Sequence, residues 1–171
     1  MPANLDVIIK NMLDISTIDL TRYVAPWNQT RWLVCSSLFF FVPCIYGFYM
    51  EQYFLAIISL LTATFSINFW RDANYSYRRT MDVIMAKIAF LIYMIKGVSY
   101  IVWPPFVITG YSALVGIIYC YYMSNKHGDT DLWWKYHMVF HLLIVYNQMI
   151  GIKSISDANA GYDEIYSNKE L

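Results

Sequence analysis

The stretch WLVCSSLFFFVPCIYGFYMEQYFLAIISLLTATFSINFW, residues 32–70, decides the fold of this 171-residue chain. It consists of two apolar runs, 32–50 and 53–70, separated by a single Glu-Gln pair. A helix needs about 20 mostly apolar residues to cross the hydrocarbon core of a bilayer. Both runs have this length, so they predict a tight hairpin of two membrane-spanning helices. Pro43 is expected to kink the first of them.

The composition of the whole chain supports a membrane location. Hydrophobic residues make up 58% of the chain and charged residues 14%, whereas a soluble domain carries about 25% charged residues. A chain this short cannot hide so much apolar surface in one core. Its 12 Lys and Arg balance its 12 Asp and Glu, so no basic excess exists to attract nucleic acid. We expect an integral membrane protein and leave open an organellar or viral membrane.

Three further apolar runs follow the hairpin, at residues 82–101, 106–123 and 132–150. Lys87 and Lys96 interrupt the first of these, which leaves open whether it crosses the whole membrane. The sequence therefore predicts an all-α membrane protein, a bundle of about five transmembrane helices.

Two flanking segments complete the expected organisation. Residues 1–30 carry apolar side chains at helical spacing beside acidic ones, which predicts an amphipathic helix in the membrane interface or docked on a partner protein. Residues 31–150 form the bundle, and residues 151–171 are expected to be a polar C-terminal tail.

The positive charges predict the orientation. With five spans, the face on the N-terminal side of the first span (side A) holds more Lys and Arg than the opposite face (side B). Side A holds Lys10, Arg22, Arg31, Arg71, Arg78, Arg79 and Lys126. Side B holds Lys96, Lys153 and Lys169. The positive-inside rule makes side A the cytoplasmic face or its organellar equivalent.

Four polar residues fall in the side-A half of the predicted membrane region: Ser66, Asp82, His137 and His141. Ionisable groups within a bilayer usually face the bundle interior. The two histidines are one helical turn apart, so they share a face, and this spacing lets a helix present two imidazoles to one zinc ion. The alternative is a pair of histidines that form hydrogen bonds between helices.

In this order on the second, third and last spans, these residues resemble the CREST superfamily of membrane hydrolases, which includes alkaline ceramidases and adiponectin-receptor-like proteins. The resemblance implies a helical bundle with a zinc ion near one membrane face and hydrolysis of a lipid amide by zinc-activated water. His137 and His141 would bind zinc, Asp82 would orient or activate the water, and Ser66 would donate a hydrogen bond. The pattern departs from the family at Trp70, where the family has a histidine, and in having five expected spans rather than seven.

Arg71, Arg78 and Arg79 lie between the second and third spans. Arginine forks match phosphate geometry, so these residues are candidates for contact with lipid headgroups or phosphate. The alternative is a positively charged cytoplasmic loop whose arginines pair with nearby aspartates.

Two functions remain open at this point. The first is a non-enzymatic accessory or structural subunit of a membrane complex, whose partners are membrane lipids and other membrane subunits. It is favoured by the small size, the absence of a third zinc ligand in the pattern, and the N-terminal helix. The second is an intramembrane zinc-dependent lipid hydrolase, with zinc as cofactor.

Overall fold

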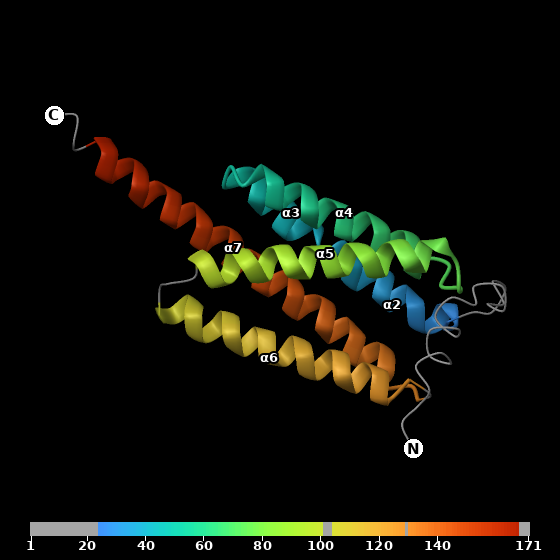
Figure 1. Ribbon diagram of the computed structural model, residues 1–171. Coiled ribbons are helices and arrows are strands. Elements are labelled where there is room, and N and C mark those ends of the chain that lie inside the picture. Colours follow the sequence, from blue (N-terminus) through green and yellow to red (C-terminus); the bar gives the residue numbers. More distant parts are fainter. Residues whose placement is uncertain (1–23, 101–103, 129, 168–171) are drawn as a thin grey trace, which may run out of the picture.

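The computed structural model of the chain describes residues 24–100, 104–128 and 130–167. The regular elements of these residues are the helices α2 (Trp27–Leu38), α3 (Phe41–Tyr49), α4 (Tyr53–Trp70), α5 (Tyr77–Tyr100), α6 (Pro104–Lys126) and α7 (Trp133–Ser167). The long helices run roughly side by side and alternate in direction along the chain (Figure 1). The amphipathic helix expected before the first span falls mainly in residues 1–23, outside the described residues.

Among the described residues, four helical segments are long and apolar enough to cross a membrane. They are Trp27–Tyr49, Tyr53–Trp70, Pro104–Lys126 and Trp133–Ala160. The remaining expected span, 82–101, corresponds to α5, a helix of 24 residues that is long enough but is not among these four. Its apolar sequence contains Lys87 and Lys96.

The first span is interrupted as Pro43 predicts. One helix ends at Leu38 and the next begins at Phe41. Proline has no N–H with which to bond the carbonyl of the residue four positions earlier, and its ring crowds that carbonyl. That carbonyl belongs to Phe39, and it accepts a hydrogen bond from the Val42 N–H at 3.0 Å instead.

The tight hairpin between α3 and α4 is confirmed, with only three residues between the two helices. Glu51 adopts a φ of 58° in this turn, a left-handed conformation that is costly for any residue except glycine. The helices then touch at Gly47, where an added Cβ would lie 3.0 Å from the Cβ of Ala56. A glycine is required there because the two backbones approach so closely.

Helix α4 lies at the centre of the bundle. It contributes buried side chains to each of the four apolar clusters of the described residues, namely Leu55, Ile58, Ala63 and the Phe69–Trp70 pair. In its 18-residue apolar segment, 50% of α4 is buried inside the bundle, whereas the corresponding share for α6 is 22%. Helix α6 packs along α7, and α5 packs on α4 and α7. Helix α6 is therefore a peripheral helix.

Helix α7 is longer than the predicted span 132–150. It continues through the segment expected to be a polar tail and runs for 35 residues, or about 52 Å at 1.5 Å per residue. Ile152 and Ile155 are buried in a cluster with Leu55 of α4, so the first turns after residue 150 belong to the packed bundle. The last turns extend beyond the other helices (Figure 1).

Candidate functional site

His141 is a buried member of the histidine pair on α7, with 4% of its surface exposed. Its Nδ1 lies 2.8 Å from the hydroxyl oxygen of Ser36 on α2, and that hydroxyl also lies 3.1 Å from the Leu33 carbonyl oxygen. A hydroxyl has one hydrogen to donate. Both contacts become hydrogen bonds only when Ser36 donates to Leu33 and the Nδ1–H of His141 donates to Ser36. The arrangement therefore favours the Nδ1–H tautomer, which leaves Nε2 as the unprotonated nitrogen.

His137 lies one turn earlier in an aromatic setting. Its ring centroid is 4.8 Å from that of His141 and 5.1 Å from that of Trp70. Its Nδ1 faces the Ser124 hydroxyl of α6 at 3.4 Å. Trp70 thus occupies the place beside the histidines where the family resemblance would require a third imidazole. The indole N–H of Trp70 is buried and has no hydrogen-bond partner.

Ser66 and Asp82 form a second pair, between α4 and α5. The Asp82 carboxyl interacts with the Ser66 hydroxyl, and Arg79 is the charged group that acts on it. The Ser66 hydroxyl also lies 2.9 Å from that of Ser37 on α2. Ser37 in turn donates to the Leu33 carbonyl at 2.7 Å.

The two pairs therefore meet at α2. Ser37 contacts the Ser66–Asp82 pair, and its neighbour Ser36 contacts His141. These polar residues lie on four helices, α2, α4, α5 and α7. The sequence pattern identified the residues of both pairs as candidates but did not identify Ser36 and Ser37, which lie between the pairs. The signal that could have found them is their position as adjacent hydroxyls within an otherwise apolar run.

These residues do not supply a complete zinc site. A catalytic zinc site needs three protein ligands, and His137 and His141 supply two. Within residues 24–100, 104–128 and 130–167, no three His, Cys, Asp or Glu side chains gather where they could hold a metal. No reaction step through zinc is derived from this geometry.

The three candidate phosphate-contacting arginines have different surroundings. Arg78 forms an ion pair with Asp72 at 2.5 Å. The Arg79 guanidinium lies over the Tyr75 ring, 5.1 Å from its centroid, and Arg71 is exposed. Arg71 and Arg79 are both exposed, and contact with phosphate stays a prediction.

A second polar cluster joins α4, α5 and α7 deeper in the bundle. The Ser59 hydroxyl lies 2.9 Å from the Tyr93 hydroxyl and donates to the Gln148 side-chain oxygen at 3.2 Å. Ser59 and Gln148 come from different helices, α4 and α7, and the structure brings them together. Tyr93 was missed, because a tyrosine in an aromatic-rich helix carries no specific signal.

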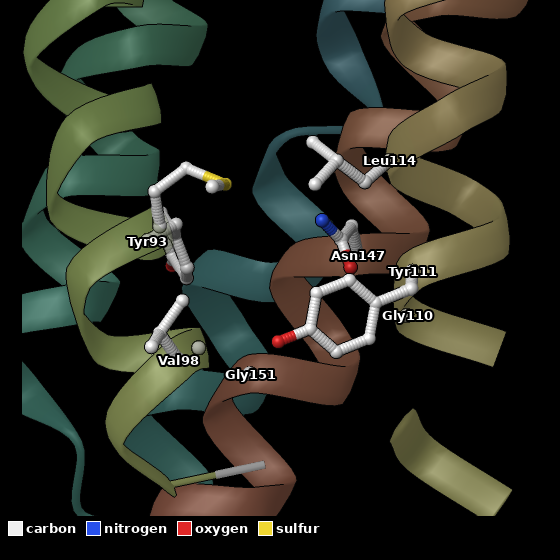
Figure 2. A pocket seen from close by; sticks show the side chains of 9 residues that line it. Tyr93, Val98, Gly110, Tyr111, Leu114, Asn147 and Gly151 are labelled. Atoms are coloured by element: carbon white, nitrogen blue, oxygen red, sulfur yellow. The ribbon is translucent and has the colours of Figure 1, made fainter. Parts of the chain in front are cut away.

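A small cleft lies beside this cluster, between α5 and α6, with α7 as its floor. Its volume is about 40 Å³, enough for one or two water molecules. Figure 2 shows Tyr93 and Val98 on one wall, Tyr111 and Leu114 on the other, and Asn147 of α7 between them. Each of the three helices that line the cleft contributes one glycine: Gly97 of α5, Gly110 of α6 and Gly151 of α7.

Comparison of the chain with protein-family models, with curated proteins and with solved structures finds no match. The assignment of a function therefore depends on the residues and their geometry.

Proposed function

We propose that this chain is a non-enzymatic integral membrane subunit of five transmembrane helices, which assembles with another membrane protein through α5 and α6. The observation that carries the proposal is the peripheral position of α6. It packs along one helix of the described bundle, α7, and a glycine-lined cleft separates it from α5. Small residues on helix surfaces let a neighbouring helix approach closely in a membrane.

The connectivity of the helices supports the proposed five spans. Helix α5 begins where α4 ends and ends where α6 begins, with short connections at both ends. Helices α4 and α6 run in the same direction in Figure 1, so if both cross the bilayer, α4 ends at one membrane face and α6 begins at the opposite one. The helix between them, α5, must then cross the bilayer as well. The exposed Lys87 of α5 then argues that this helix crosses with protein beside it, because an isolated lysine in lipid is costly.

The polar groups of the bundle interior support a structural role. His141 and Ser66 each form a hydrogen bond with a serine of α2, and polar contacts of this kind hold membrane helices together. The contacts of His141 Nδ1 and of the Ser66 hydroxyl lie within the bundle, which is the arrangement expected of packing groups.

Site-specific photo-crosslinking tests this proposal in the membranes in which the chain is expressed. A photoreactive residue replaces Leu114, in the cleft wall, and the matched control replaces Ile45, which is 68% exposed on α3. We expect a discrete protein adduct from position 114 and lipid adducts alone from position 45. Lipid adducts alone from both positions would refute assembly through the cleft.

Zinc-dependent lipid hydrolysis is the second candidate, and one observation favours it. Both histidines direct Nδ1 toward serines, which leaves both Nε2 nitrogens for a ligand, as in zinc sites whose histidines are oriented by outer groups. The test is the zinc content of the protein purified in detergent, compared with that of the His137→Ala/His141→Ala double variant. About one zinc per chain that the double variant loses would replace the subunit proposal with the hydrolase.

A further inference from the structure

Lys87 occupies an unusual position on α5. It is the eleventh of 24 residues in this helix, about 15 Å from its start in a helix about 36 Å long. Its side chain is on the exposed surface of the bundle. If α5 crosses the bilayer, Lys87 lies on the outer surface of the bundle near the middle of the membrane. Lysines near helix ends can extend their charge to the interface, but a central one is poorly placed to do so.

No ion pair within the described part of the chain neutralises Lys87. The ion pairs there join Arg78 to Asp72 and Lys153 to Asp157. The other lysine of α5, Lys96, lies over the ring of Tyr100, 5.3 Å from its centroid. Lys96 thus has a local partner on its own helix, whereas Lys87 faces outward without one.

The surface around Lys87 has the spacing of a helix-packing face. Ile84, Lys87, Leu91, Met94 and Val98 follow one another at intervals of three and four residues, so they form one stripe along α5. Ile84, Leu91 and Val98 are 47%, 60% and 64% exposed. Such a stripe is the pattern with which one helix receives another.

This stripe leads into the cleft between α5 and α6. Met94 and Val98 belong both to the stripe and to the cleft wall, opposite Tyr111 and Leu114 of α6 (Figure 2). The glycine of α5 in this wall, Gly97, removes side-chain bulk where a helix would enter. A helix that lies along the stripe would therefore rest between α5 and α6 while passing Lys87.

We propose that this surface binds a transmembrane helix of a different protein, and that a carboxylate near the middle of that helix pairs with Lys87. This inference rests on the proposed function and names the chemistry of the partner. Lipid phosphates lie at the membrane interface, too far from a central lysine. A second copy of this chain offers no suitable carboxylate among the described side chains. Asp82 faces Ser66, Asp157 is paired with Lys153, and Glu51, Asp72 and Asp131 lie in turns between helices.

A peptide-association experiment tests the pairing. The full chain, labelled with a fluorescent acceptor, is reconstituted in phosphatidylcholine vesicles with donor-labelled Leu/Ala transmembrane peptides that carry Asp, Leu or Lys at the centre. We expect at least tenfold tighter association of the Asp peptide than of the Leu peptide. Lys87→Leu should abolish this preference, and Lys87→Asp should transfer it to the Lys peptide. The matched control, Lys96→Leu, should retain the preference for the Asp peptide.

Equal association of the Asp and Leu peptides with the wild-type chain would overturn the inference, as would a preference that survives Lys87→Leu. Because Lys87→Leu removes a charge from an exposed apolar face, we expect this variant to fold, and its thermal midpoint in detergent verifies this. The photo-crosslink at position 114 tests assembly without reference to charge. A protein adduct there, together with equal peptide association, would retain the subunit proposal and reject the Lys87 pairing.

Discussion

Ser36→Ala tests whether His141 serves as a structural link between α2 and α7. The substitution removes the 2.8 Å contact between the two helices and leaves the Nδ1–H of a histidine that is 4% exposed without an acceptor. The Leu33 carbonyl keeps its bond from Ser37 at 2.7 Å, so the substitution creates no second unpaired group.

The expected change in the free energy of unfolding follows from the contacts that Ser36→Ala removes. Hydrogen bonds between membrane helices contribute about 0.6 kcal/mol on average and about 1.7 kcal/mol at most, and an unpaired buried polar group costs about 1–3 kcal/mol. We therefore expect Ser36→Ala to lower the free energy of unfolding by about 1–2 kcal/mol. In a double-mutant cycle with His141→Leu, the coupling energy should be about 1 kcal/mol.

The assay is reversible unfolding of the purified protein in mixed detergent and SDS micelles, followed by tryptophan fluorescence and circular dichroism. Ser112→Ala is the matched control, because the Ser112 hydroxyl bonds the Ile108 carbonyl of its own helix and the residue is exposed. It should change stability by less than about 0.5 kcal/mol. Equal effects of Ser36→Ala and Ser112→Ala, or a coupling energy near zero, would refute the link between α2 and α7.

Three further substitutions test other features of the bundle. Gly47→Ala should destabilise the protein by about 1–2 kcal/mol in the same unfolding assay, because the new Cβ lies 3.0 Å from the Cβ of Ala56 and 3.2 Å from its backbone N and Cα; combining it with Ala56→Gly should recover only part of the loss, since the backbone contacts remain, and unchanged stability of Gly47→Ala would contradict the close approach. Glu51→Gly should raise the free energy of unfolding by about 1 kcal/mol, since it relieves a φ of 58°, and a decrease would show that the Glu51 side chain stabilises the turn. Trp70→His places a third imidazole beside His137 and should confer about one zinc per chain by metal analysis; a variant that folds without gaining zinc would contradict the proximity of the two rings.

Much of the fold could be predicted from apolar run length and chain-breaking residues. The Pro43 interruption and the hairpin at Glu51 were predicted because each has a local cause, the missing proline N–H and a two-residue polar gap. The end of the last helix could not be predicted in this way. Ile152 and Ile155 are buried by contacts with distant helices, and the polar residues around them resemble a tail when only neighbours in sequence are considered.

The candidate site was predictable only within each helix. Spacing along a helix predicts that His137 and His141 share a face, but it does not predict which residues of other helices contact that face. The contact of His141 with Ser36 joins residues 105 positions apart, and it depends on how α2 and α7 are rotated about their axes. The same applies to Lys87: the sequence placed it within a span, and only the packing of α5 on α4 and α7 turned it outward.

The length of α7 determines how far its C-terminal end would extend beyond the membrane surface on side B. A straight helix of 35 residues spans about 52 Å, whereas the hydrocarbon core is about 30 Å thick and the bilayer with its headgroups about 40–45 Å. If Trp133 lies at the side-A boundary of the hydrocarbon, the last turn of α7 rises about 15 Å above the headgroups of side B. The length of the helix alone would then determine how far above the lipid headgroups a water-soluble molecule could contact this chain.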